Sequence, residues 1–176
     1  GFRTLEARAA VAGCDVGLVT MHMLGDSPAT MQANPVYADV VAEVGRFLMD
    51  SRQALLDAGV APERICLDPG FGFGKTLAHN LALYRGIPAW ASVAPVLVGV
   101  SRKSMLGAIT GQPVERRLAA SLAGALAGVQ MGAIIVRVHD VPETVQALAV
   151  WTAIGLPAAA GSVHIGDGHP GRPAKE

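Results

Sequence analysis

The sequence predicts an α/β fold built from four consecutive strand–helix units. Four short runs are almost continuously apolar, as strands buried on both faces of a parallel sheet must be; they cover residues 16–21, 65–68, 95–100 and 134–138. Segments with apolar residues at helical spacing separate and follow these runs. Such units build either a small open doubly wound sheet or half of a (β/α)₈ barrel, and periodicity does not separate the two.

The first two helices differ in how clearly the sequence marks them. Asn34 followed by Pro35 is typical of an N-cap and a first helical position, and Gly59 marks the end of that helix. The segment after the second strand is a weaker helix prediction, because Gly86 and Pro88 interrupt it.

The last two helices follow the third and fourth strands. One is predicted to begin near Pro113 and to end at Gly132, with Leu118, Leu122, Ala125, Leu126 and Val129 as its apolar stripe. The other has a capping-box-like start, Asp140 followed by Glu143, and is predicted to turn Val141, Val145, Leu148 and Thr152 to one side before it ends at Gly155.

Composition excludes several classes of protein. Hydrophobic residues make up 51% of the 176 residues and charged residues 16%, which excludes a disordered chain. The 14 Lys and Arg balance the 14 Asp and Glu, so we expect neither nucleic acid nor an anionic membrane as a partner. The uncharged stretch 119–136 contains Ser121, Gln130 and Gly132 and is better explained as a helix followed by a strand than as a membrane span.

Two cysteines and a distinct C-terminal segment complete the organisation of the chain. Cys14 and Cys66 form no CxxC or CxxH pattern, so we expect buried thiols in a reducing cytoplasm rather than a disulfide or a zinc site. Residues 1–157 are predicted to form the folded unit. Residues 158–176 are rich in Gly, Pro, Ala and His and are predicted to be a disordered tail.

Polar residues gather where the predicted strands end. Both candidate architectures bind ligands at the carboxyl ends of their strands. Asp68 ends the second apolar run, where a carboxylate is costly unless it is paired or hydrogen-bonded. It suits a pair of donors such as the N–H and amino group of a guanine-like heterocycle, or else it caps the following loop.

A glycine-rich run, residues 70–76, follows Asp68. It is not a Walker A loop, because Pro69 stands five positions before Gly74, and its glycines do not match GxGxxG. The glycines permit close approach of a ligand. Phe73 within the run offers a flat face to an aromatic substrate or anchors the loop in the core, and the sequence leaves both interpretations open.

The third and fourth strands contribute the cationic residues. Lys103 and Ser104 can open a short helix, with Ser104 near a carboxylate and Lys103 donating to a ring carbonyl. Arg102 is equally consistent with a solvated turn. Arg137 and His139 are two apart and project to one face, which suits a phosphate or diphosphate. For His22, a structural role is the favoured interpretation.

Together these motifs resemble dihydropteroate synthase. The resemblance covers the chain up to about residue 156, and its motifs occur in the family's order. The motifs are Met21-His22-Met23 with Gly25, Pro28 and Met31-Gln32; residues 68–76 with His79-Asn80; Ser101-Arg102-Lys103-Ser104 with Leu106-Gly107; and Arg137-Val138-His139-Asp140-Val141.

The resemblance implies a (β/α)₈ TIM barrel of which this chain covers about the last four βα units. It implies the joining of 6-hydroxymethyl-7,8-dihydropterin diphosphate to 4-aminobenzoate, with release of diphosphate, in folate biosynthesis. Asp68, Lys103, Arg137 and Met21 would bind the pterin. Arg137 and His139 would hold the diphosphate, while Phe73 and Ser104 would contact the aminobenzoate.

The resemblance also sets expectations beyond this chain. We expect the family's Mg²⁺ ligand in an N-terminal half that precedes this sequence, no metal ligand in this chain, and a homodimer for the full-length protein. Two other interpretations stay open. One is a pterin-binding methyltransferase domain, against which the motifs at Ser101 and Arg137 argue; the other is a non-catalytic pterin-binding fragment.

Overall fold

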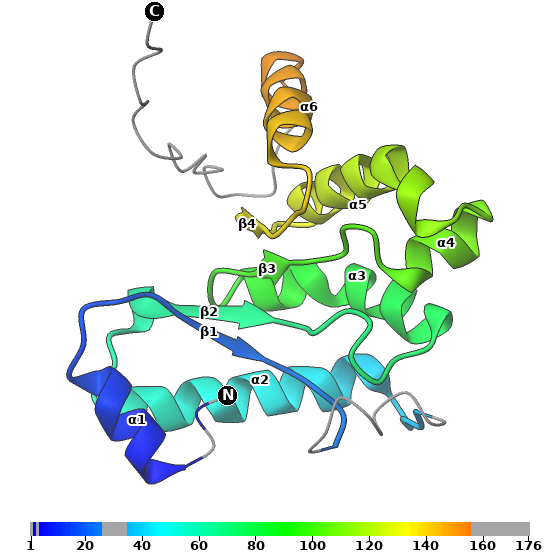
Figure 1. The fold of residues 1–176 in the computed structure, drawn as a ribbon. Coiled ribbons are helices and arrows are strands. Elements are labelled where there is room, and N and C mark those ends of the chain that lie inside the picture. The colour runs from blue at the N-terminus through cyan, green and yellow to red at the C-terminus, as the bar shows by residue number, and fades with distance from the viewer. Residues whose placement is uncertain (1, 3, 26–34, 156–176) are drawn as a thin grey trace, which may run out of the picture.

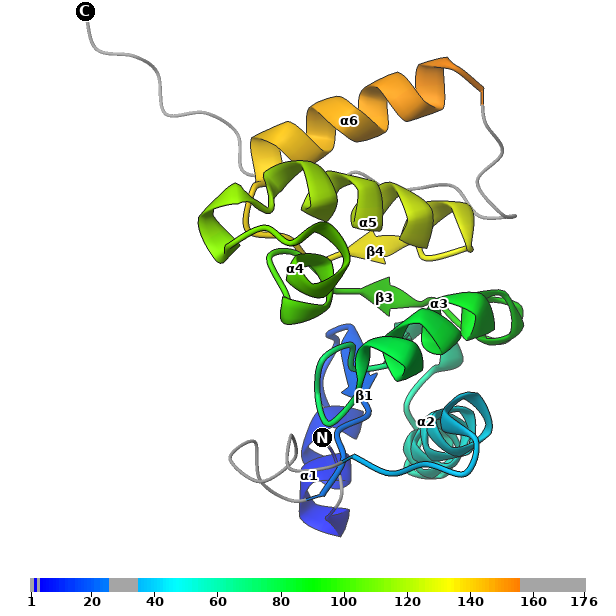
Figure 2. The same cartoon turned by 90° about the vertical axis from the view of Figure 1, so that its right-hand side faces the viewer.

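The computed structural model describes residues 2, 4–25 and 35–155, which form an α/β structure (Figures 1 and 2). Its elements are, in chain order, α1 (Leu5–Ala12), β1 (Leu18–Met21), α2 (Val40–Asp57), β2 (Ile65–Asp68), α3 (Leu77–Ala91), β3 (Leu97–Val98), α4 (Ser104–Thr110), α5 (Leu118–Gln130), β4 (Ile135–Val136) and α6 (Val141–Ala153). Short 3₁₀ turns, Pro62–Arg64 and Val114–Arg116, precede β2 and α5. The predicted tail lies outside the described residues.

The strands are parallel and lie side by side in chain order. β1 pairs with β2 so that Met21 lies opposite Asp68, and β3 pairs with β4. Leu67 joins the two pairs, because its N–H donates to the carbonyl oxygen of Pro95 at 2.8 Å and it forms a parallel bridge with Val96. The predicted α/β class is therefore confirmed, although β3 and β4 are shorter than the apolar runs that indicated them.

Burial differs between the inner strands, β2 and β3, and the outer strands, β1 and β4. α2 packs against β1 and β2, and α5 packs against β4. On the opposite face Val19 and Ile135 are each 41% exposed. A hollow of about 350 Å³ borders both of these side chains. The expectation of strands buried on both faces is thus confirmed for β2 and β3, in which every residue is buried, but not for β1 and β4.

The starts of α2 and α3 follow local hydrogen bonding. α2 begins at Val40 rather than after Pro35, because the side chain of Asp39 accepts hydrogen bonds from the backbone N–H groups of Val41 and Ala42. The predicted N-cap Asn34 lies outside the described residues. α3 is a continuous helix and begins with a capping box between Thr76 and His79.

The prediction that Gly86 and Pro88 interrupt this helix is wrong, because α3 is continuous from Leu77 to Ala91. A Cβ at Gly86 would lie 2.8 Å from Cγ1 of Val41 on α2, so the glycine lets the two helices approach closely. Pro88 lies inside the helix and is accommodated there.

The last two helices also differ from the sequence prediction. α5 begins at Leu118, after the 3₁₀ turn, and it buries Ser121, Ala125, Gly128 and Val129 rather than the whole predicted stripe. The carboxylate of Asp140 does not cap α6, because it pairs with Arg102.

Two other surface features differ from expectation. Thr144 and Leu148 are the buried residues of α6, whereas Val141 and Val145 are exposed. Cys14 is exposed rather than buried, and Cys66 is buried as expected.

Among the described residues no helix is both long enough and apolar enough to cross a membrane.

Leu48 is a fully buried residue of α2 and belongs to the main hydrophobic core. Leu48→Ala should lower the free energy of unfolding by about 2–5 kcal/mol, because it removes buried methyl groups and leaves a cavity. Arg46→Ala, at an exposed position of the same helix, is the control and should change it by less than about 0.5 kcal/mol. Urea unfolding measures both, and equal effects would contradict the described core.

Candidate functional site

The carboxyl ends of the strands border one cavity of about 680 Å³. Its lining comes from the loop after β2, the turn after β3, the 3₁₀ turn before α5 and the end of β4. The lining residues are Phe73, Gly99, Ser101, Arg102, Lys103, Val114, Arg137, Val138 and His139. Of the residues that the sequence predicts for the site, the structure brings Phe73, Lys103, Arg137 and His139 together here.

Asp68 is the last residue of β2 and is only 5% exposed. Its Oδ1 accepts a hydrogen bond of 2.7 Å from the backbone N–H of Gly70. Burial raises the pKa of this carboxyl group, while the Gly70 hydrogen bond and the charges of Lys103, Arg137 and Lys75 act in the opposite direction. The site therefore holds a buried acid close to several basic side chains.

The glycine-rich loop, residues 70–74, has an unusual backbone. Gly70, Gly72 and Gly74 have φ angles of +70°, +78° and +68°, in the left-handed region that favours glycine. At Gly70 a Cβ would lie 1.8 Å from the carbonyl oxygen of His22. Any side chain at that position would force β1 and the loop apart.

Two lysines hold the carbonyl groups of this loop. Lys75 Nζ donates to the carbonyl oxygens of Gly70 at 2.9 Å and Phe73 at 3.0 Å. Lys103 Nζ donates to the carbonyl oxygen of Phe71. The loop therefore presents its carbonyl oxygens to amines that come from different parts of the chain.

Two neutral side chains complete the support of the loop. Asn80 Oδ1 accepts from the N–H of Gly72 at 2.9 Å, and the hydroxyl of Tyr37 donates to the carbonyl oxygen of Gly74 at 3.0 Å. Asn80 is buried on α3, and Tyr37 lies just before α2. Side chains from three segments thus fix the path of the loop.

The two phenylalanines of the loop have different environments. Phe71 is fully buried, and its ring centroid lies 4.7 Å from that of Tyr84. Phe73 is partly exposed and lines the cavity. Of the two interpretations left open for Phe73, its position favours the flat face toward a ligand, because Phe71 is the core anchor.

Lys103 contacts both the backbone and the aromatic part of the loop. Its Nζ lies 4.7 Å from the ring centroid of Phe73, in a cation–π contact. Burial lowers the pKa of Lys103 to about 8, Asp68 opposes this shift, and Arg137 adds to it. Lys103 is therefore a cation whose charge is sensitive to its neighbours.

Arg137 and His139 lie on the same side of the extended segment at the end of β4, as their spacing predicts. Both are exposed. The Nη2 atom of Arg137 would be 3.3 Å from a Cβ at Gly99, so the glycine leaves room for the guanidinium. His139 Nδ1 lies 3.0 Å from Oγ of buried Ser101, which also accepts from the backbone N–H of His139 at 3.2 Å.

The remaining predicted residues lie at the edge of this group. Ser104 is the exposed first residue of α4, as expected, but it does not line the cavity. Met21 is half-buried, and its Cγ would be 3.4 Å from a Cβ at Gly70. Arg102 is an exposed residue with a φ of +58° and forms an ion pair with Asp140.

Sequence reasoning missed three residues of the site. Lys75 lies within the motif of residues 68–76, but nothing in the sequence pattern shows that its side chain turns inward. Ser101 supports His139, and its place in the motif after the third strand was the available signal. Val114 lines the cavity from the 3₁₀ turn before α5, and no pattern in the sequence indicated it.

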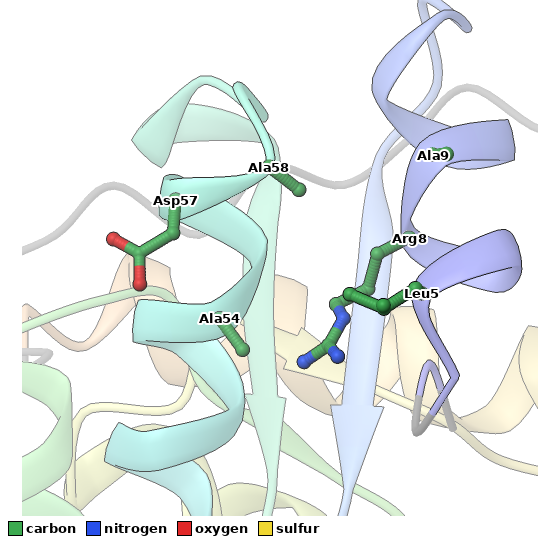
Figure 3. A pocket seen from close by; sticks show the side chains of 6 residues that line it. All are labelled: Leu5, Arg8, Ala9, Ala54, Asp57 and Ala58. Carbon is green, nitrogen blue, oxygen red and sulfur yellow. The ribbon is translucent and has the colours of Figure 1, made fainter.

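A second hollow, of about 470 Å³, lies between α1 and α2 (Figure 3). Three of its lining residues are alanines, and the carboxylate of Asp57 points away from Arg8 and accepts a hydrogen bond from Gln53. Polar groups do not converge there as they do at the strand ends. Among the described residues no cluster of three His, Cys, Asp or Glu side chains could hold a metal ion.

These features define an α/β protein whose candidate site lies at the carboxyl ends of parallel strands. The family model described as "Pterin binding enzyme" matches residues 2–139. The chain therefore belongs to the pterin binding enzyme family.

Relatives and solved structures agree with this assignment. Dihydropteroate synthase of Neisseria meningitidis serogroup B is 52% identical over 147 residues, which are 81% of this chain and 51% of the relative. Dihydropteroate synthase of Xanthomonas albilineans in complex with 7,8-dihydropteroate matches with a TM-score of 0.78 at 45% identity, over 87% of this chain and 56% of that one. The same enzyme with 4-aminobenzoic acid matches with a TM-score of 0.79 and the same identity, over 87% and 54%. The chain thus spans about half the length of its curated relatives.

Gly70 provides a test of the loop geometry. Gly70→Ala should lower the free energy of unfolding by more than about 3 kcal/mol for two reasons. The new methyl group would clash with the carbonyl oxygen of His22, and alanine is strained in the left-handed backbone conformation of this position. Gly111→Ala is the matched control, since Gly111 has the same φ of +70° but open space around it, and should cost about 1–2 kcal/mol. Similar losses in chemical denaturation would argue against the close approach.

The lowered pKa of Lys75 should make the stability of the protein depend on pH. Burial lowers its pKa from 10.5 to about 7. Between these values the unfolded chain binds more protons at this position than the folded chain does. The contribution of Lys75 to the free energy of unfolding is therefore constant below about pH 7 and rises as pH increases toward 10.5.

The difference between the wild type and Lys75→Met, measured by urea unfolding from about pH 6 to about pH 9.5, isolates this contribution. We expect the difference to grow by roughly 1.4 kcal/mol for each pH unit well inside the window. A difference that stays flat or falls above about pH 7 would show that Lys75 keeps its proton in the folded state.

Proposed function

We propose that this chain provides the pterin-binding side of a dihydropteroate synthase, which joins 6-hydroxymethyl-7,8-dihydropterin diphosphate to 4-aminobenzoate. The observation that carries the proposal is the placement of buried Asp68 near Lys103 and Arg137, two residues that line the cavity at the ends of the parallel strands. The identity to dihydropteroate synthases supports it, because those proteins are known by that activity.

Asp68 would bind the ring N–H and amino group of the pterin. The backbone N–H of Gly70 donates to Oδ1 of this buried carboxylate. With its second oxygen as well, the carboxylate suits a pair of donors. Lys103 would donate to the carbonyl side of the pterin. Arg137 would stack on the pterin ring, because its guanidinium lies against Gly99 at the edge of the cavity.

The other predicted residues would hold the second substrate and the leaving group. Phe73 would contact the aromatic ring of aminobenzoate, and the exposed hydroxyl of Ser104 its carboxylate. Arg137 and His139 would bind the diphosphate, since both reach the cavity from the end of β4. Ser101 accepts a hydrogen bond from the backbone of His139 and thereby steadies this end of the site.

The chemistry would proceed with departure of the leaving group first. The bond between the pterin methylene carbon and the diphosphate oxygen breaks, and the electron pair leaves with the diphosphate. The resulting pterin cation would be stabilised by the carboxylate of Asp68. The aryl amine then forms the C–N bond to the methylene carbon and loses one proton to solvent.

The resemblance also carries proposals about the surroundings of the site. We propose that the βα units described here belong to a (β/α)₈ barrel, in which further strands would cover the half-open face at Val19 and Ile135. We propose that the Mg²⁺ ligand of the family lies in the part that this chain does not match. A homodimer and a cytoplasmic location are proposed on the resemblance alone.

The direct test is formation of 7,8-dihydropteroate by the natural gene product that carries this sequence. The protein is incubated with both substrates and Mg²⁺, and the product is separated by chromatography. Formation of dihydropteroate that depends on both substrates supports the proposal. Binding of the pterin without product would replace the synthase with a non-catalytic pterin-binding protein, and the absence of binding would overturn the proposal.

The role of Lys103 can be tested separately. Lys103→Ala should weaken binding of the pterin diphosphate by about 1.5–3 kcal/mol, which is the scale of a hydrogen bond to a charged group. Arg85→Ala, which removes an exposed cation from α3, is the control and should leave the affinity unchanged. Calorimetry measures both, and an unchanged affinity in Lys103→Ala would contradict the proposed placement of the pterin.

A further inference from the structure

The side chain of Lys75 ends in a closed set of polar contacts beneath the glycine-rich loop. The residue is 5% exposed. Its Nζ lies 3.0 Å from Nδ1 of His22, 2.9 Å from the carbonyl oxygen of Gly70 and 3.0 Å from that of Phe73. Lys75 does not line the cavity, so the proposed chemistry gives it no role.

The number of these contacts matches the hydrogen-bonding capacity of the amine in either charge state. An ammonium group has three N–H donors, which His22 Nδ1 and the two carbonyl oxygens can accept. A neutral amine has two N–H donors for the carbonyls and one lone pair, which can accept from His22 if Nδ1 carries the hydrogen. The two carbonyl contacts therefore survive the loss of one proton, and the contact with His22 survives it when the hydrogen of the neutral ring moves to Nδ1.

His22 is held in place by its own neighbours. It is buried, its ring meets that of Phe47 edge-on with centroids 5.0 Å apart, and the ring of Tyr37 lies at 6.1 Å. Its backbone N–H donates to the carbonyl oxygen of Asp68 at 3.1 Å. The pair of His22 and Lys75 thus joins the end of β1 and the end of β2 to the loop.

Charged and titratable groups surround this pair from several elements. Burial is the main cause that lowers the pKa of Lys75 to about 7; Asp68 raises it and Lys103 lowers it. On the side of α2 and α3, Tyr37 contacts the rings of both His22 and His79. A proton on the pair would change the charge beside Asp68 while the amine keeps its contacts with the two carbonyl oxygens.

We propose that Lys75, paired with His22, is a positioning residue that holds the carbonyl groups of Gly70 and Phe73 and so places Phe73 and Asp68 for the two substrates, whichever of the two partners carries the proton. Phe73 is placed directly through its own carbonyl group. Asp68 is placed only indirectly, through the N–H of Gly70, and its backbone is also fixed by the pairing of β2 with β1, so we expect a smaller effect on the pterin than on the aminobenzoate. The link to substrates rests on the proposed function, whereas the hold on the loop does not.

The hold on the loop can be tested without any substitution. This sequence has only three lysines, Lys75, Lys103 and Lys175, so ¹⁵N-labelled lysine gives few signals from it. In the natural gene product with ¹³C-carbonyl glycine and phenylalanine, we expect hydrogen-bond scalar couplings from Lys75 Nζ to the carbonyl carbons of Gly70 and Phe73. The couplings should persist on both sides of the titration midpoint of Lys75. Their absence on either side would overturn the proposal.

The link to substrates is tested with Lys75→Met, which keeps an unbranched side chain of nearly the same length but removes its donors. We expect the amides of Gly70, Gly72 and Phe73 to exchange with solvent at least tenfold faster. The KM for 4-aminobenzoate should rise at least tenfold, and the KM for the pterin diphosphate should rise no more than threefold. The value of kcat should change by less than threefold in either direction. Arg85→Ala, which removes an exposed cation from α3, is the control and should change the KM for 4-aminobenzoate by less than threefold.

Each outcome separates the two parts of the account. Faster exchange without a change in either KM would show that Lys75 is only structural and would overturn the positioning role. Equal rises of both KM values with a loss of kcat would indicate general damage and would do the same. If the wild type binds neither substrate, the proposed function fails, while the couplings and amide exchange still report on the loop.

Discussion

The candidate site depends on the path of the glycine-rich loop between β2 and α3. Its glycines adopt left-handed backbone angles, and Gly70 lies so close to His22 that no side chain fits. A loop of this kind has little stability of its own, since glycine gains the most freedom on unfolding. Buried side chains from other segments hold it, and through it they fix where Asp68 and Phe73 stand.

Electrostatics explains how a chain with balanced charge can bind a polar substrate. Overall, basic and acidic residues are equal in number. Locally, Asp68 is buried near Lys103, Arg137 and Lys75, and burial moves the pKa of each of the two lysines toward neutrality. Recognition therefore comes from a few desolvated groups at the strand ends rather than from the field of the whole molecule.

Much of this arrangement follows from the sequence, because apolar runs that end in polar residues indicate where strands end. Asp68, Lys103 and Arg137 could be placed at one rim on that basis alone. The direction in which Lys75 points could not, since it depends on the left-handed turns before it. Likewise Asp140 has the pattern of a helix cap, yet the nearby guanidinium of Arg102 takes its carboxylate. Tertiary contacts decided both cases.

The same distinction applies to the helices. Gly86 and Pro88 lower helix propensity locally, but close packing of α3 on α2 outweighs this cost and makes use of the missing side chain. The exposed residues of α6 and the half-open strand face could not be foreseen, because each depends on which surfaces the described elements cover.

A crystal structure of the natural gene product with the pterin diphosphate and 4-aminobenzoate would test the central claim most directly. The account predicts the pterin ring between Asp68 and Arg137, the aminobenzoate ring against Phe73, and the backbone of the glycine-rich loop unchanged. A pterin bound away from Asp68, or a loop that abandons its contacts with Lys75 when substrates bind, would contradict it.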